Sequence, residues 1–225
     1  MARPPNPDAP RRLLAAARAA FAASGVEQAR VQDITGAAGF SKAAFYLYFE
    51  SKDAVFAQLV HEFFRACISI SDERHAAIQV LVAEDGPPLA DDWLRGTSRL
   101  QRYQAIELDS GTRILATLWE WRDVFACIEQ ASGPRRAVID QVMAATRDLT
   151  GSRLREAAAV GMLRPDIDVD LVAEMLVGIY LQLARRMLRL DAAPDFGAWA
   201  RQTDRLVGSG VHPLPPATAP LPGDP

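Results

Sequence analysis

Apolar residues recur at helical spacing along almost the whole chain, and this periodicity constrains the fold more than any other feature. Near the N-terminus, Leu13, Leu14, Ala17 and Phe21 follow one another three or four residues apart, as on one face of a helix. Alternating β-branched residues, which would indicate strands, are scarce. The sequence therefore predicts an all-α protein.

Glycine and proline divide this pattern into segments. Breaks are expected at 86–88, at Gly111, at 133–134 and between 161 and 165. The predicted helices are 8–24, 31–38, 42–49, 52–71, 73–84, 89–108, 111–130, 134–160, 168–190 and 194–207. Residues 208–225 contain six prolines and three glycines and are predicted to be a disordered tail.

Composition excludes several classes of protein. A chain of 225 residues with 49% hydrophobic residues is long enough to bury a core. Cys67 and Cys127 are too few for a disulfide scaffold, and no apolar run approaches the roughly 20 residues of a membrane span. The polar, proline-rich N-terminus lacks the apolar core of a secretory signal, so we expect a cytoplasmic protein.

The charge is unevenly distributed along the chain. The formal net charge is −3, yet residues 1–60 carry seven Arg and Lys against five Asp and Glu. The only two lysines, Lys42 and Lys52, lie ten positions apart in this N-terminal part. A local excess of positive charge is compatible with nucleic-acid binding, although the net charge of the whole chain does not itself suggest it.

Residues 31–52, VQDITGAAGFSKAAFYLYFESK, predict two short helices joined by a tight turn. Gly39 lets the backbone leave the first helix with positive φ, and Ser41 can cap the second. Ile34 and Phe45 would pack between the two helices. This is the helix-turn-helix arrangement, whose second helix enters the major groove of DNA.

The same segment resembles the DNA-binding domain of the TetR family of bacterial transcription regulators. The resemblance rests on Ala38-Gly39-Phe40-Ser41-Lys42, on the aromatic run 45–49 and on Ser51-Lys52. It implies a three-helix DNA-binding domain over 8–52 and a larger helical ligand-binding and dimerisation domain over 53–207. The DNA-contacting residues that it implies are Gln32, Ser41, Lys42, Ala43, Tyr46 and Lys52.

Three positions depart from the family pattern. Arg30 stands where Thr or Ser usually caps the first helix of the motif, so that cap is missing, is supplied from elsewhere, or is replaced by a phosphate contact. Ala43-Ala44 removes a hydroxyl, which shifts specificity towards thymine methyl contacts and groove shape. Leu47 replaces a residue that is usually polar or aromatic.

The C-terminal part offers candidate dimer and ligand surfaces. Apolar stripes on 134–160 and 168–190 fit either an intramolecular core or, as the resemblance implies, a four-helix dimer interface. The predicted interface residues are Val138, Val142, Leu149, Val172, Leu176, Ile179 and Leu183. Large aromatics fit either core packing or the wall of an apolar ligand pocket, and the candidates are Trp93, Tyr103, Trp119, Trp121, Phe125 and Tyr180.

No pattern of catalytic or metal-ligating residues stands out. His61, His75 and His212 have no metal-ligand spacing with either cysteine, and no catalytic triad or phosphate-binding glycine loop occurs. We therefore predict no enzyme activity, no metal and no cofactor. The expected protein is a homodimeric repressor, released from a palindromic DNA operator by a small apolar or aromatic inducer. The alternative is a helical ligand-binding or protein-interaction protein whose DNA-binding motif is inactive.

Overall fold

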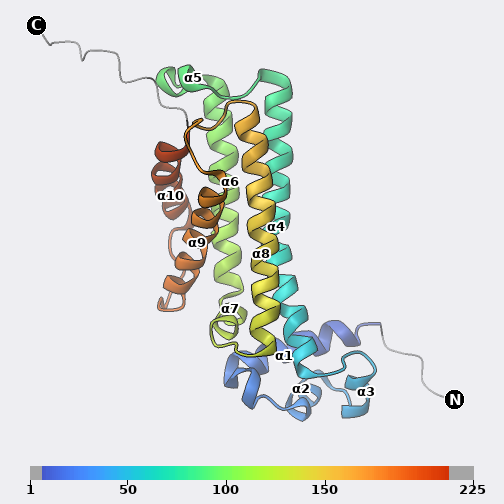
Figure 1. The fold of residues 1–225 in the computed structure, drawn as a ribbon. Coiled ribbons are helices and arrows are strands. Elements are labelled where there is room, and N and C mark those ends of the chain that lie inside the picture. The colour runs from blue at the N-terminus through green and yellow to red at the C-terminus, as the bar shows by residue number, and fades with distance from the viewer. Residues whose placement is uncertain (1–6, 213–225) are drawn as a thin grey trace, which may run out of the picture. The chain divides into compact units, whose positions relative to one another are not determined.

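The computed structural model describes residues 7–212, and all regular elements in that range are helices (Figure 1). This confirms the all-α prediction. The helices are α1 (Ala9–Gln28), α2 (Val31–Ala38), α3 (Lys42–Tyr46), α4 (Lys52–Asp85), α5 (Ala90–Arg95), α6 (Ser98–Glu120), α7 (Arg122–Glu129), α8 (Pro134–Ala159), α9 (Val169–Met187) and α10 (Phe196–Val211). No helix among the described residues combines the length and the hydropathy that crossing a membrane requires.

Two predicted helix breaks are wrong. The helices expected at 52–71 and 73–84 are one continuous helix, α4, because nothing at 71–73 interrupts the helical backbone. Gly111 does not end a helix but lies inside α6 and is buried. A β-carbon at Gly111 would lie 3.5 Å from both Ala200 Cβ and Tyr180 Oη, so this glycine serves close packing rather than a turn. The breaks fall instead at Gly96, where φ is +63°, and at Trp121.

Several helix ends also differ from the expected ones. α3 ends at Tyr46 rather than at 49, α9 ends at Met187 rather than at 190, and α1 continues through a kink at Gly25. α10 extends to Val211, so the first residues of the predicted disordered tail are helical. The rest of that predicted tail, 213–225, lies outside the described residues.

The described residues divide into two compact units, each made of several separate segments of the chain. The first unit contains residues 7–68, 117–145 and 184–190, and the second contains 69–116, 146–183 and 191–212. Each of α4, α6, α8 and α9 contributes residues to both units. The helix-turn-helix thus folds together with segments that are far away in the sequence.

In the first unit, α1 packs against α2 and α7. Its centre is aromatic: the rings of Phe63 and Phe125 lie 6.3 Å apart, and Phe45 and Phe56 are fully buried. Each such side chain contributes about 1.5–3 kcal/mol when it is removed from water. This packing supports the short helices α2 and α3, which would not be stable alone.

The second unit has its own core, in which Ile78, Leu81, Leu100, Tyr103 and Met162 cluster. His212, at the end of α10, stacks on Trp93 with ring centroids 4.3 Å apart. Its Nδ1 lies 3.1 Å from the Met162 carbonyl oxygen. The end of α10 is therefore fixed by specific contacts.

Candidate nucleic-acid interface

The turn between α2 and α3 has the geometry that the sequence predicts. Gly39 adopts φ +73° and ψ +33°, the left-handed region that favours glycine. The N–H of Phe40 then donates to the Thr35 carbonyl at 2.9 Å, and the N–H of Gly39 donates to the Gly36 carbonyl at 3.2 Å. These bonds satisfy the last carbonyls of α2 and reverse the chain.

A serine cap and one buried aromatic residue fix α3. Ser41 Oγ accepts a hydrogen bond from the Ala44 N–H at 3.1 Å, which confirms the expected cap. Phe45 is fully buried, as is Ile34 on α2. With this face inward, Ser41, Lys42 and Ala43 are exposed, and Tyr46 is 50% exposed. The cap residue and the five residues of α3 thus present a hydroxyl, an ammonium and a phenol to solvent.

Arg12 of α1 holds this turn in place, although the sequence gives no indication of it. Its Nη2 donates to the Ala38 carbonyl at 2.7 Å, and its guanidinium carbon lies 5.0 Å from the centroid of the Phe40 ring. The interaction joins α1 to the last residue of α2 and to the turn. Its only sequence signal would be an arginine near the start of a helix, which is too common to be informative.

The two lysines have different environments. Lys42 is exposed, and no described residue forms an ion pair with it. Lys52 Nζ lies 2.6 Å from the Glu27 carbonyl oxygen and 3.4 Å from that of Ala29. An ammonium has three donors, so Lys52 keeps one for the predicted phosphate contact. Within the chain it fixes the end of α1.

Arg30, the first of the three departures, does not cap α2. It occupies the N-cap position in an extended conformation, without a side-chain cap hydrogen bond. The N–H groups of Asp33 and Ile34 donate to its carbonyl oxygen at 3.0 and 3.2 Å. The N–H groups of Val31 and Gln32 come before this point and lie outside the helical hydrogen-bond pattern. Arg30 and Gln32 are both exposed at this end. Such a helix start favours an anion, so the two side chains are well placed for a phosphate.

Two groups of ion pairs tie α1 to the rest of the first unit. Arg18 on α1 bonds to Asp123 on α7 at 2.7 and 2.8 Å, and its Nη2 donates to the Glu120 carbonyl at 2.5 Å. Arg135 on α8 bonds to Glu27 at 2.8 Å and to Asp53 at 2.6 Å. The Arg135 side chain is only 14% exposed, which reduces the screening of its ion pairs by solvent.

The six residues predicted to line a ligand pocket divide between the two units. Trp119, Trp121 and Phe125 belong to the first unit, whereas Trp93, Tyr103 and Tyr180 belong to the second. Trp121 lies under the guanidinium of Arg18 at 4.4 Å, and the Trp119 ring lies under that of Arg122 at 4.2 Å. Trp119 and Trp121 thus already pack against arginine side chains of the chain itself.

The second unit contains a buried polar cluster that the sequence did not indicate. Arg74 on α4 pairs with Glu107 on α6 at 2.5 Å, and both side chains are mostly buried. Tyr103 lies one helical turn before Glu107, with its Oη 3.5 Å from His212 Nε2. Burial, the charge of Glu107 and a hydrogen bond to it raise the pKa of Tyr103 well above its usual value. The buried phenol is therefore neutral in the neutral pH range and lies beside the paired guanidinium of Arg74.

The exposed face of α3, held by a glycine turn in an all-helical chain, defines a helix-turn-helix DNA-binding regulator. Residues 13–59 match the family described as "Bacterial regulatory proteins, tetR family". The chain is 45% identical over 204 residues to the "Uncharacterized HTH-type transcriptional regulator YdgC" of Bacillus subtilis, covering 90% of this chain and 92% of that one. It is 26% identical to the "HTH-type transcriptional repressor AcnR" of Corynebacterium jeikeium, covering 77% and 80%.

Solved structures share the fold over nearly their full length. The fatty acid degradation regulator FadR from Bacillus halodurans superposes with a TM-score of 0.68 at 20% identity, covering 92% of this chain and 98% of that one. FadR from Bacillus subtilis, solved in complex with stearoyl-CoA, gives 0.66 at 17% identity, covering 90% and 99%. The chain belongs to the TetR family of bacterial transcription regulators, as the motif in 31–52 indicated.

Proposed function

We propose that the chain is a homodimeric repressor that binds a palindromic operator and releases it when a small molecule binds. The observation that carries the proposal is the exposed face of α3, where Lys42 and Tyr46 lie one helical turn apart. Both point away from a core that holds Phe45. A repressor role is favoured by the relative AcnR, which is named a repressor.

On this proposal, contacts with phosphates position the protein on the DNA, and only a few side chains contact base edges. Lys42, Tyr46 and Lys52 bind phosphates, with Arg30 and Gln32 at the start of α2. Ser41 and Ala43 lie at the N-terminal end of α3, which enters the groove. Because Ala43 has only a methyl group, it suits a thymine methyl and offers no hydrogen bond to a base. Groove shape then carries part of the specificity.

The dimer is proposed to form through α9 together with α8. On α9, Leu171 and Met175 are 58% and 57% exposed, which is unusual for large apolar side chains four residues apart. The predicted interface residues beside them are only half-buried: Val172, Leu176, Ile179 and Leu183. On α8, Ile139 and Met143 are buried, whereas the predicted Val138 and Val142 beside them are half-buried, as is Leu149. In the proposed dimer, a second copy of the chain covers these exposed and half-buried apolar residues of α8 and α9.

We propose a ligand site in the second unit, near Trp93, Tyr103 and Tyr180. Trp93 Nε1 is buried and has no hydrogen-bond partner among residues 7–212. A buried N–H without a partner costs free energy, and a ligand acceptor would recover it. The residues packed around Trp93 and Tyr103 are largely apolar, so the proposed inducer has an apolar body with a polar group. FadR of Bacillus subtilis, whose ligand is stearoyl-CoA, has the same fold.

Selection of bound fragments from the source genome tests this function. Purified full-length protein is mixed with sheared genomic DNA, bound fragments are recovered at two salt concentrations, and they are sequenced. The proposal predicts enrichment of one or a few short palindromes, with affinity that falls as salt rises. A folded protein that enriches no sequence at either salt concentration would contradict it and favour the alternative with an inactive motif.

A further inference from the structure

Three helices of the first unit meet at the guanidinium of Arg135, which lies in the first turn of α8. Its Nη1 lies 2.8 Å from Glu27 Oε1 near the end of α1, and its Nε donates to Asp53 Oδ1 in the first turn of α4 at 2.6 Å. A guanidinium is planar and rigid, so two carboxylates bound to different nitrogens of it are held at a fixed separation. Arg135 thus ties the end of α1 and the start of α4 to α8.

This position of Arg135 does not serve α8 itself. The first turn of a helix has unpaired N–H groups and disfavours a cation, yet both Arg135 and Arg136 lie there. Arg136 bonds to Asp140 of the same helix at 2.8 Å, and this pair is exposed. Arg135 instead turns inward, and the two carboxylates that it binds belong to other helices. The contact therefore stabilises the placement of α1 and α4 against α8.

The tie acts on the segment that leads into α2. The backbone of α1 kinks at Gly25, where φ is +75°, and Glu27 lies beyond this kink. Only three residues separate Glu27 from Val31, the first residue of α2. Lys52 Nζ donates to the Glu27 carbonyl at 2.6 Å, so the side chain and the backbone of Glu27 are both held. Fixing Glu27 therefore fixes the start of α2.

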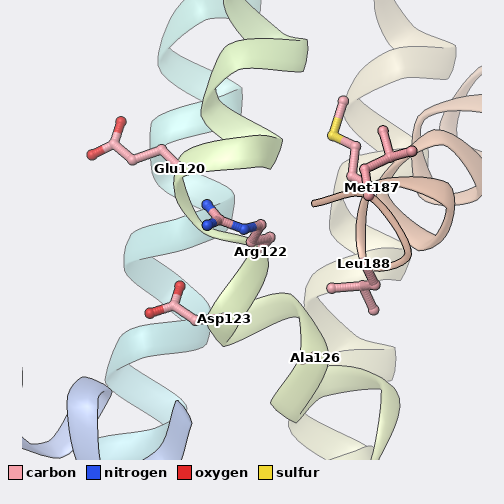
Figure 2. A pocket seen from close by; sticks show the side chains of 7 residues that line it. Glu120, Arg122, Asp123, Ala126, Met187 and Leu188 are labelled. Atoms are coloured by element: carbon pink, nitrogen blue, oxygen red, sulfur yellow. The ribbon is translucent and has the colours of Figure 1, made fainter. Parts of the chain in front are cut away.

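A separate ion pair holds α1 before the kink. Arg18 bonds to Asp123 at 2.7 and 2.8 Å. Asp123 lies at the start of α7, at the edge of an open pocket, and its carboxylate points away from Met187 and Leu188 (Figure 2). This pair and the aromatic core of the unit remain when Arg135 is replaced. Loss of Arg135 should therefore loosen the segment after the kink without unfolding the chain.

We propose that Arg135 is a positioning residue that sets the separation of the two α3 helices in the dimer. Val138 and Val142 of the proposed dimer interface follow it on α8 by three and seven positions. The second copy thus fixes this part of α8, and Arg135 fixes α1 and α2, and with them α3, relative to α8. The inference rests on the proposed function, because half-site spacing matters only to a dimer on a palindromic operator.

Hydrogen exchange of the full chain, measured by mass spectrometry, tests the tie without DNA. Arg135→Gln should speed exchange of residues 26–38 about threefold or more, because fewer contacts oppose local opening. Arg135→Lys should give an intermediate rate, since an ammonium lacks the planar fork. Arg136→Gln is the matched control at the neighbouring position and should leave 26–38 unchanged. Equal exchange in the wild type and Arg135→Gln would overturn the proposal.

Operator spacing then tests what the tie does on DNA. One base pair inserted between the half-sites moves them by about 3.4 Å and rotates them by about 35°. The wild type and Arg136→Gln should lose about tenfold or more in affinity on this operator. Arg135→Gln should lose about threefold or less, because its α3 helices adjust to the new spacing, and Arg135→Lys should restore part of the discrimination.

The salt slope separates positioning from direct contact. Arg135→Gln should keep the wild-type slope on the original operator, because a positioning residue neutralises no phosphate. A slope reduced by about one would indicate a phosphate contact and overturn the proposal, as would undiminished discrimination of spacing by Arg135→Gln. A wild type that binds no DNA would refute the proposed function, while hydrogen exchange still decides whether Arg135 fixes the start of α2.

Discussion

Arg18 and Asp123 are 105 positions apart in the sequence, yet their side chains meet in two hydrogen bonds of 2.7 and 2.8 Å. The pair fixes α1, the helix on which α2 is packed, to the start of α7. Burial alone would raise the pKa of Asp123, but hydrogen bonds from Arg18 and from the Val124 N–H hold that pKa below its usual value. The carboxylate is therefore ionised throughout the neutral range.

Asp123→Asn should lower the free energy of unfolding by about 1.5–3 kcal/mol, the usual value of hydrogen bonds to charged groups. Asparagine has one oxygen, so one bond to the partly buried Arg18 is lost. Chemical denaturation measures the change. Asp140→Asn is the control, because its pair with Arg136 is exposed and should cost about 0.5 kcal/mol or less. Equal losses in the two variants would show that the Arg18 pair is no more than a surface contact.

The two glycines of α2 and its turn should respond to alanine with opposite signs. Gly39→Ala should destabilise by about 1–2 kcal/mol, since φ is +73° and the new β-carbon would lie 3.2 Å from Arg12 Nη2. Gly36→Ala should stabilise by about 0.5–1 kcal/mol, because Gly36 is helical and its β-carbon would meet nothing within 4 Å. Thermal unfolding of both variants decides this, and a shift of the same sign in both would contradict it.

Met175→Glu should convert the dimer to a monomer. Each copy would bury a carboxylate in the proposed apolar interface, which costs several kcal/mol when unpaired. Sedimentation velocity over a range of concentrations gives the mass. Leu206→Glu on α10 provides the control, since Leu206 is 72% exposed and lies outside the proposed interface. If both variants sediment like the wild type, α9 does not form the interface.

Acidification should destabilise the second unit through His212. Burial lowers the pKa of His212 below its usual 6.5, despite the hydrogen bond to the Met162 carbonyl. The neutral form is favoured in the folded state, so its contribution to stability is present above pH 6.5 and is lost as pH falls below it. The thermal midpoint of the wild type should therefore fall between pH 7 and pH 5 by more than that of His212→Gln. An equal fall in both would exclude His212 as the cause.

Local signals predicted the helix-turn-helix well. Gly39, Ser41 and Phe45 each act within a few residues, through a positive φ, a cap and a buried ring, and all three are where the sequence placed them. The missing side-chain cap at Arg30 is one of the alternatives that the sequence left open. Such features depend on residue chemistry and spacing alone, so no knowledge of distant contacts is needed.

Contacts between residues that are far apart in the sequence could not be predicted from local signals. Gly111 indicated a break because glycine is a weak helix former, yet tertiary packing against Ala200 keeps it helical. The ammonium of Lys52 meets carbonyls at the end of α1, and nothing in the sequence distinguishes this contact from a phosphate contact. Arg18 and Arg74 could not be distinguished from ordinary helix arginines because their partners are 105 and 33 positions away in the sequence.

The most direct test of the account measures operator affinity against salt for three proteins: the wild type, Lys42→Ala with Tyr46→Ala, and Lys52→Ala. We predict that the double variant loses about 100-fold or more in affinity and reduces the salt slope, with its thermal midpoint unchanged. Lys52→Ala should lower the midpoint by a few degrees, because its bonds to Glu27 and Ala29 are lost. A double variant that retains the wild-type affinity and salt slope would contradict the claim that α3 binds DNA.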